Sequence, residues 1–268
     1  MSACKIGISA GAYKGITIEE TMPYLRNAGF DATFTGYRDL AQVSRFAELF
    51  AANGIFYESI HAPWDNINQI WLDGEEGARV LARFCECVES CAAIGVPIAV
   101  VHLSSGENPP PVTDCGRGRW ETLIETAEKN NIVLAFENQR KLSNLAYIFE
   151  TYPHHPNVAF CWDCGHESCF TPGRSYMPLF GKKLVCTHLH DNFGLPDRQT
   201  PDVHILPFDG NMDYQYVADM LDRDNYRGTL MLEVSSRHET YANMTAEDYY
   251  LRAAAALRRL ESLRRPQA

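Results

Sequence analysis

The sequence has a shortage of positive charge. Its 268 residues include 24 Lys and Arg against 34 Asp and Glu, which gives a formal net charge of -10. The nearest approach to a basic cluster is the C-terminal pairs Arg258-Arg259 and Arg264-Arg265, which fit one solvated face of a closing helix. A chain this acidic repels nucleic acid and anionic membrane surfaces. We therefore expect neither a nucleic-acid partner nor a membrane partner.

Long apolar runs are also missing. None approaches the ~20 residues that a membrane span requires, and the N-terminus lacks the basic and apolar regions of a signal peptide. The nine cysteines are an odd number and fall inside expected helices and strands, which fits free thiols better than a disulfide framework. Cys161-x-x-Cys164 has no partner pair, so small buried side chains are the better interpretation. We expect a cytoplasmic protein.

Strand and helix signals alternate along the whole chain. Short apolar runs predict strands, and apolar residues at helical spacing predict the helices between them. The expected strands are 5–9, 31–36, 55–61, 98–102, 132–137, 158–163, 184–190 and 229–233. The expected helices are 17–29, 39–54, 74–95, 120–130, 142–152, a short one within 167–181, 213–221 and 246–263.

This order predicts the fold class. Eight strand–helix units, each too short to bury its own strand, predict an α/β protein with a (β/α)8 TIM barrel, formed as a single domain over residues 1–268. The alternative is an open doubly wound sheet, which usually carries a glycine-rich phosphate turn after its first strand. Gly7-x-x-x-Gly11 is too loosely spaced for that turn.

Titratable side chains end most of the expected strands. In a TIM barrel the chemistry lies at the carboxyl ends of the strands. An isolated His beside an apolar run is more often a core residue, but a whole set converging on one rim argues for a metal site. The set is His61, His102, Glu137, Asp163 with His166, His188 with His190, and Glu233, joined by Asp202 and His204 in the loop after the seventh strand. This mixture of nitrogen and oxygen ligands suits zinc, manganese or cobalt.

Several of these strand ends resemble those of the xylose isomerase-like TIM-barrel superfamily. The matching segments are SIHAP (59–63), VH (101–102), FEN (136–138), WDCGH (162–166) and THLHDN (187–192). That group contains sugar epimerases, sugar-phosphate isomerases, inosose dehydratase and the second family of apurinic endonucleases. The resemblance covers nearly the whole chain. It implies a divalent metal, Zn2+ or Mn2+ with Mg2+ or Co2+ also compatible, held by Glu137, Asp163, His188 and Glu233.

The seventh strand offers two histidines for one ligand position. His188 and His190 point the same way from a strand. Members of the superfamily tend to carry an acid three residues after the ligand, and Asp191 stands three residues after His188. The resemblance therefore favours His188 as the ligand and gives His190 a substrate-facing role. From the sequence alone, the choice between them stays open.

The endonuclease branch of the superfamily holds two further zinc ions. By resemblance one would use His61 and His102, and the other would use His166, Asp202 and His204. With a single metal, His61, His102 and His166 would instead face the substrate. A pI near 5.4 and a very short loop at residues 37–39 argue against a DNA-binding rim.

Trp64 and Arg140 are further candidates for binding a substrate. Trp64 can stack on the apolar face of a sugar, or it can pack the rim. Arg140 can anchor a phosphate or carboxylate, or it can form a structural salt bridge.

The resemblance implies an isomerase or epimerase of a small sugar or sugar derivative. Glu137 and Glu233 would exchange protons with the substrate carbon, through a metal-stabilised enediolate. The alternatives are an inosose dehydratase-like lyase, a trinuclear-zinc apurinic endonuclease and a non-catalytic metal- or sugar-binding barrel. The sequence leaves open which sugar is bound, whether it is phosphorylated, and whether the protein is a homo-oligomer.

Overall fold

Strands and helices alternate in the expected order. The computed structural model describes residues 4–194 and 202–265. Within these ranges the strands are β1 (Ile6–Ser9), β2 (Ala32–Gly36), β3 (Phe56–His61), β4 (Ile98–His102), β5 (Val133–Glu137), β6 (Val158–Asp163), β7 (Leu184–His188) and β8 (Leu230–Leu232). The α-helices there are α1 (Ile18–Ala28), α2 (Leu40–Ala52), α3 (Glu75–Ile94), α4 (Asp114–Asn130), α5 (Leu142–Thr151), α6 (Cys164–Phe170), α7 (Met177–Phe180), α8 (Tyr214–Arg223) and α9 (Ala246–Leu263). Short 3-10 helices are η1 (Ile67–Trp71), η2 (Gly181–Lys183) and η3 (Glu239–Tyr241).

The strands form one parallel sheet. Their order is β7-β6-β5-β4-β3-β2-β1-β8, so each strand from β1 to β7 lies beside its neighbour in sequence. The first strand pairs with the last, and an isolated parallel bridge joins Leu189, just after β7, to Leu232 of β8. This is the connectivity of a TIM barrel, and the predicted fold class is confirmed. The extent of the single domain, residues 1–268, stays a prediction.

The chain divides into two compact units. The first unit comprises residues 1–34, 49–57 and 162–268, and the second comprises residues 35–48 and 58–161.

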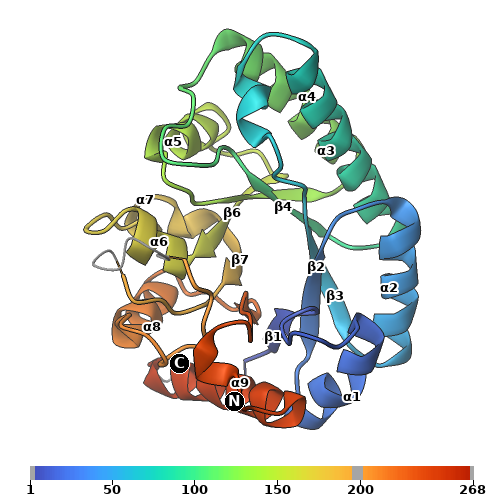
Figure 1. Cartoon of the computed structure of the whole chain (residues 1–268). Coiled ribbons are helices and arrows are strands. Elements are labelled where there is room, and N and C mark those ends of the chain that lie inside the picture. The colour runs from blue at the N-terminus through green and yellow to red at the C-terminus, as the bar shows by residue number, and fades with distance from the viewer. Residues whose placement is uncertain (1–3, 195–201, 266–268) are drawn as a thin grey trace. The chain divides into compact units, whose positions relative to one another are not determined.

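In the first unit, α9 packs against α1 and α8 (Figure 1). Its apolar face buries Ala253, Leu257 and Leu260, and the ring of Tyr250 stacks on Tyr24 of α1 with centroids 6.0 Å apart. Where β1 pairs with β8, the Met231 side chain packs directly over Gly7, and a Cβ there would lie 2.6 Å from the Met231 sulfur. These contacts hold the β8 strand end in place.

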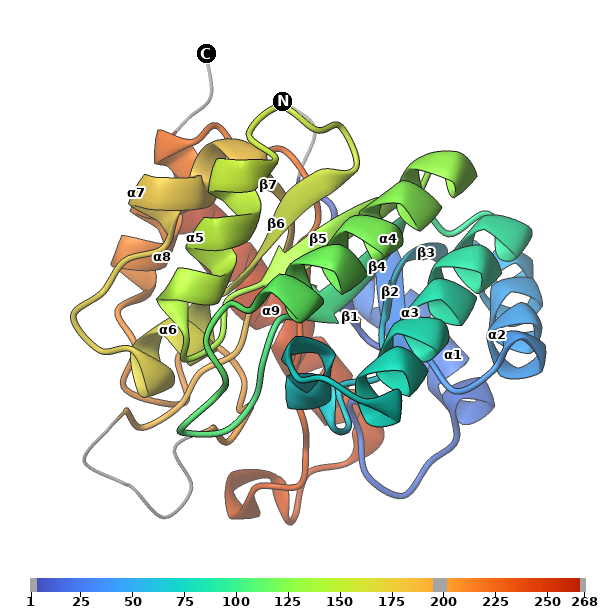
Figure 2. The same ribbon diagram turned by 90° about the horizontal axis from the view of Figure 1, so that it is seen from above.

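In the second unit, α3 and α4 lie side by side (Figure 2). The ring of Trp120 joins them, 5.8 Å from Phe84 of α3, and it also packs 5.7 Å from Phe136 of β5. Trp71 of η1 lies 5.9 Å from Trp120 and donates its indole N–H to the Leu103 carbonyl at 2.6 Å. The rim segment after β3, which carries Trp64, is therefore anchored to the core of this unit.

Three element boundaries differ from those expected. Helix α4 begins at Asp114 and not near residue 120, because Thr113 caps it and Gly116 leaves room for the Trp71 ring. Helix α6 begins directly after β6, capped by Asp163. Strand β7 ends at His188, so His190 lies beyond the strand and not within it.

The other expectations that the structure tests concern thiols and membranes. All nine cysteines fall within the described residues and are free, and both Cys161 and Cys164 are buried. Among the helices of residues 4–194 and 202–265, none combines the length and apolar character needed to cross a bilayer.

Candidate metal centre

Four side chains of the first unit converge beyond the ends of β6 and β7. They are His166, His190, Asp202 and His204, and one ligand atom from each lies within 4.8 Å of all the others. We call these four residues the histidine cluster. Its location follows from local structure, because Asp163 accepts the backbone N–H of His166 at 2.6 Å and thereby caps α6. The cap places the His166 side chain within the first turn after β6.

Asp202 lies between the histidines of this cluster. Its Oδ2 is 3.3 Å from Nε2 of His166, and its Oδ1 is 3.2 Å from Nε2 of His204. Nε2 of His190 is 3.7 Å from the same Oδ1. Two ligand atoms bound about 2.1 Å from one tetrahedral zinc ion lie roughly 3.4 Å apart. The spacing of the cluster therefore fits a single divalent cation.

His204 has the hydrogen bonding of a metal-binding histidine. Its Nδ1 lies 2.8 Å from the Glu233 carbonyl oxygen, which can only accept, so Nδ1 carries a proton and Nε2 faces the cluster. Burial disfavours a charged His204, but Asp202 and Glu233 outweigh that effect and raise its pKa to about 9. Burial likewise opposes the charge of Asp202, whose pKa is nevertheless lowered by His166 and His204. The local field thus favours a cation.

His190 is enclosed by the cluster. Its ring has no exposed surface, and its Nε2 lies 3.0 Å and 3.2 Å from the two oxygens of Asp163. The ring stacks on His204 with centroids 3.9 Å apart, and a Cβ at Gly165 would overlap it. These contacts join His190 to the candidate metal ligands Asp163 and His204, and its expected role against the substrate stays a prediction.

His188 and Glu233 form a second contact within the first unit. Nδ1 of His188 lies 3.2 Å from Oε2 of Glu233, and its buried ring stacks on Phe34 at 4.7 Å. The Glu233 side chain is 23% exposed, whereas that of Asp163 is fully covered. Of these two carboxylates, Glu233 is therefore the more accessible.

The second unit has its own group of ligand atoms. Nδ1 of His61 donates to the Ala62 carbonyl at 2.8 Å, which leaves Nε2 facing His102 at 3.1 Å and Glu137 at 3.4 Å. Nε2 of His102 lies 3.1 Å from the other oxygen of Glu137. We call His61, His102 and Glu137 the second cluster, and its donor set and spacing also suit a divalent cation.

The four ligands expected from the resemblance are divided between the units. Glu137 belongs to the second unit, and Asp163, His188 and Glu233 belong to the first. Their joint action on one ion stays a prediction.

The two expected substrate contacts both lie in the second unit. Trp64 is 54% exposed, with its ring 6.2 Å from that of His102. Arg140 is half-buried just after β5. Substrate binding by either side chain stays a prediction.

Two residues of the candidate site, Gln139 and Gly165, were not predicted from the sequence. Gln139 donates to Glu137 at 3.0 Å and also contacts His102 at 3.2 Å. A signal was available, since residues two apart on an extended backbone point the same way. Gly165 had none, because its role depends on the His190 ring, which comes from the segment after β7.

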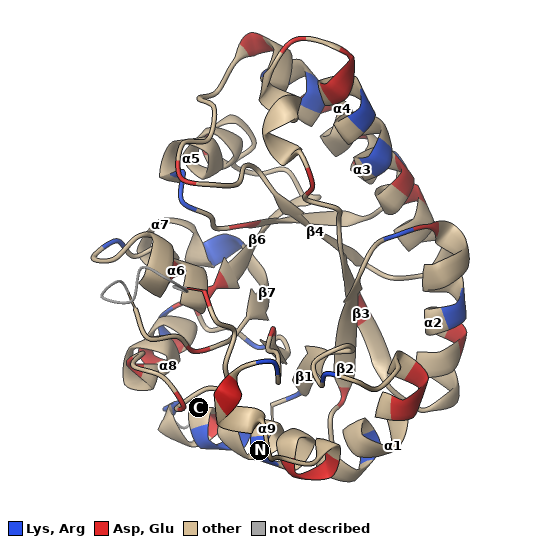
Figure 3. Cartoon of the chain, in the orientation of Figure 1, with Lys and Arg blue, Asp and Glu red and all other residues tan. Residues whose placement is uncertain are grey.

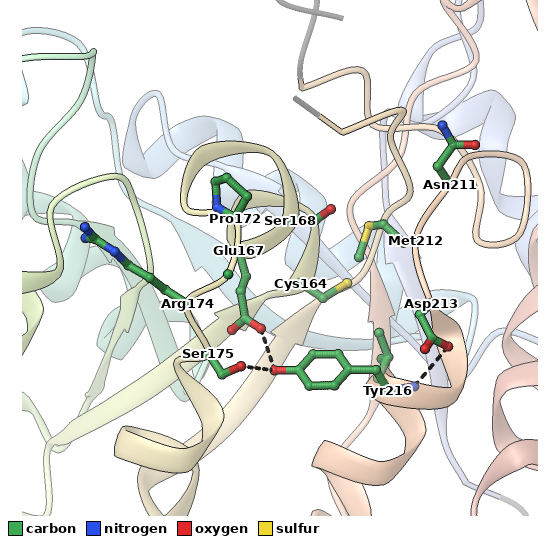
Figure 4. Close-up of a pocket in the computed structure, with 12 residues that line it drawn as sticks. Cys164, Glu167, Ser168, Pro172, Arg174, Ser175, Asn211, Met212, Asp213 and Tyr216 are labelled. Atoms are coloured by element: carbon green, nitrogen blue, oxygen red, sulfur yellow. Dashed lines mark hydrogen bonds between the residues drawn. The ribbon is translucent and has the colours of Figure 1, made fainter. Parts of the chain in front are cut away.

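A pocket of about 370 Å³ lies between α6 and the start of α8, lined by Cys164, Glu167 and Tyr216 among others (Figure 4). Glu167 is buried there, and burial raises its pKa, although its hydrogen bonds oppose this shift. Its carboxylate accepts from the Tyr216 hydroxyl at 2.8 Å, the Tyr176 N–H at 2.8 Å and the indole N–H of Trp162 at 3.1 Å. With both oxygens committed to protein donors, Glu167 serves the packing of α6 against α8.

The sequence matches one known protein family over most of its length. A family model described as "Xylose isomerase-like TIM barrel" matches residues 22–260. The chain belongs to the xylose isomerase-like TIM-barrel family. The resemblance inferred from the strand ends is thereby confirmed.

The chain is also similar to one relative in sequence and to several solved structures in fold. The uncharacterized protein y4fM of Sinorhizobium fredii is 29% identical over 190 residues, and the match covers 66% of this chain and 58% of that protein. This chain therefore spans less than two thirds of that relative's length.

The solved structures share the xylose isomerase-like fold at low identity. They include the IOLI protein with a binding zinc atom (TM-score 0.78, 17% identity, 98% of this chain and 100% of that one). D-allulose 3-epimerase from Methylomonas sp. in complex with D-allulose has a TM-score of 0.73 at 16% identity, over 97% and 98% of the two chains. An L-ribulose 3-epimerase has a TM-score of 0.71 at 21% identity, over 97% and 95%. At these identities the likeness is one of fold.

Proposed function

We propose that this chain is a divalent-metal-dependent isomerase or epimerase of a small sugar or sugar derivative. The observation that carries the proposal is the convergence of imidazole and carboxylate atoms at strand ends, with His188 and Glu233 3.2 Å apart. Membership of the xylose isomerase-like family supports it, since structures of the same fold include two named sugar epimerases.

The principal ion, Zn2+ or Mn2+, would be held by Glu137, Asp163, His188 and Glu233. When bound, such an ion polarises a substrate carbonyl and acidifies the adjacent C–H bond. Two facts support this donor set: His188 and Glu233 have the spacing of ligands on one ion, and one solved structure of this fold is named for its zinc atom.

A second ion would be held by the histidine cluster. The expected ligands His166, Asp202 and His204 are joined there by His190, which brings the donor set to four. Neither Glu137 nor Glu233, the two glutamates expected to exchange protons with the substrate, belongs to this donor set. The second ion would therefore stabilise the rim and leave the chemistry to the first.

Proton transfer would be carried out by two glutamates. Glu233, whose carboxylate is partly exposed, would take the proton from the carbon beside the carbonyl. Glu137 would return a proton to the opposite face of that carbon in an epimerase, or one of the two would return it to the neighbouring carbon in an isomerase. Substrate and product then have the same composition, so no oxidant is needed. The exposed ring of Trp64 would provide an apolar surface for the sugar.

The test is deuterium exchange with a panel of ketoses in D2O, using metal-loaded protein. Wild type should introduce deuterium at the reacting carbon, and Glu233→Gln should lower turnover by roughly 10²–10⁴-fold, the usual loss of a general acid–base group. Glu239→Gln, an exposed glutamate after β8, is the matched control and should retain full turnover. Product formed at a normal rate without deuterium would exclude this chemistry. A product lighter by one water would instead indicate the dehydratase alternative.

A second candidate function is phosphodiester cleavage. It is favoured by the second cluster, whose ligand atoms at 3.1–3.4 Å offer room for a further ion beside Glu137. The overall charge of -10 argues against this candidate. We therefore rank it below the isomerase.

A further inference from the structure

Residues 202–212 carry two ligands of the histidine cluster without the support of a helix or strand. We call this segment the ligand arm. Asp202 and His204 stand at its start, and α8 begins just beyond its end. Ligands on irregular backbone hold their positions only if other groups fix that backbone. The question is which groups fix the ligand arm.

Asp191 makes five of the hydrogen bonds that fix it. Its side chain is fully buried, and its two oxygens accept four backbone N–H groups, three of them from the arm. Oδ2 accepts from Phe208 and Gly210 at 3.0 Å each, and Oδ1 accepts from Met212 at 3.1 Å and from Asn192 at 2.8 Å. The backbone of Asp191 also pairs with Ile205 in both directions, at 2.8 Å and 3.1 Å. One residue thus holds the arm at four points.

The conformation held in this way is not one that the arm would adopt unaided. His204 and Phe208 are non-glycine residues with φ of 49° and 71°. Side chains with a Cβ rarely adopt such angles, and they persist only where the surroundings enforce them. Gly210 lies so close to Asp191 that a Cβ there would meet both its carboxylate and the Asn192 carbonyl. The arm and Asp191 are therefore fitted to each other.

We propose that Asp191 is a positioning residue that sets the ligand arm before any cation binds. Asp202 and His204 then reach the cluster in ligand position, and binding requires little rearrangement. This inference rests on the proposed second ion, but it concerns binding and not turnover. It therefore stands or falls independently of which sugar, if any, the protein converts.

The first test uses wild-type protein and amide hydrogen exchange. After removal of metal with a chelator, the N–H groups of Phe208, Gly210 and Met212 should stay protected, because their acceptor is Asp191 and not a metal ligand. Addition of Zn2+ should change their protection little. Fast exchange without metal, with protection appearing only after Zn2+ is added, would overturn the proposal.

The second test is a Co2+ titration followed by d–d absorption. His166→Ala identifies the binding step that belongs to the histidine cluster. Asp191→Asn replaces one acceptor oxygen by an N–H2 donor, and it should weaken that step by about 10–100-fold, as loss of supporting partners does in metal sites. The other steps should be unchanged. Equal weakening of every step, no weakening, or a wild type without a cluster step would each refute the role of Asp191.

The matched control is Asp213→Asn. This substitution removes the same charge one residue past the arm. The Asp213 carboxylate caps α8 by accepting the backbone N–H groups of Gln215 and Tyr216, and asparagine caps a helix equally well. This variant should bind Co2+ like wild type. If it lost the cluster step as fully as Asp191→Asn, local charge and not positioning would be the cause.

Discussion

Gly165 shows how one missing side chain shapes the candidate site. The His190 ring occupies the space where any Cβ at position 165 would lie. The amide of Asn192 also donates to the Gly165 carbonyl at 3.0 Å, so the glycine backbone is tied to the loop after β7. Close approach of the two segments brings His190 onto both oxygens of Asp163.

The variant Gly165→Ala should therefore disturb the histidine cluster. We expect a loss of about 1–3 kcal/mol in unfolding free energy from overpacking, and weaker Co2+ binding at the cluster. Urea unfolding and Co2+ titration measure the two effects.

Gly118→Ala is the control for this change. Gly118 lies inside α4 with open space around its Cα, so alanine should leave stability unchanged or raise it by up to ~1 kcal/mol. Equal losses in the two variants would show that the His190 contact is not what makes Gly165 necessary.

The sequence predicted ligands but not their partners. His61, His102, Asp163 and His188 stood out because each lies at or near the carboxyl end of an expected strand. The enclosure of His190 depends on a contact between segments after β6 and β7. No periodicity in either segment encodes that contact.

The start of α1 was predicted correctly, down to its capping box. Thr17 accepts the N–H of Glu20 at 3.2 Å, and the Glu20 carboxylate accepts the N–H of Thr17 at 2.7 Å. Both residues are exposed or nearly so, so the cap can be changed without disturbing the core.

Thr17→Ala should lower the unfolding free energy by about 1 kcal/mol, the usual loss of an N-cap side chain. Thr122→Ala in the middle of α4 is the control. The Thr122 hydroxyl donates a hydrogen bond to the Gly118 carbonyl within the same helix, and alanine is the better helix former there. Chemical denaturation of both variants checks this, and a loss at Thr122 as large as that at Thr17 would contradict the role of the cap.

Boundaries set by tertiary packing were not predicted from the sequence. Gly116 and Gly118 weaken the helix pattern at the start of α4, yet Gly116 is what admits the Trp71 ring. The expected seventh strand continued to residue 190, but regular pairing in β7 ends at His188 and a parallel bridge at Leu189 follows. Local pattern fixed the type and order of these elements, whereas neighbours fixed their ends.

Charge acts at the scale of the whole molecule. The chain has ten more acidic than basic side chains, and both signs are interspersed along α3 and α4 (Figure 3). Such a surface gives a polyanion no continuous stripe of counter-charge. The ligand pattern is compatible with a phosphodiester substrate, whereas the acidic charge of the chain favours a small neutral substrate.

We accordingly expect no measurable incision of duplex DNA bearing an abasic site, even with Zn2+ supplied and at low salt. A gel assay with end-labelled duplex checks this outcome. Efficient incision that disappears in His166→Ala would reverse our ranking and promote the phosphodiesterase.

The nine free thiols make the protein its own probe of local opening. Cys164, Cys169 and Cys186 are buried in the first unit, while Cys87, Cys91 and Cys161 are buried in the second. A thiol reagent can reach them only when the surrounding segment opens. The labelling rate of each cysteine, measured by mass spectrometry, would therefore report local opening in each unit separately, with no engineered label. A comparison of these rates with and without bound metal would show which unit the ion stabilises.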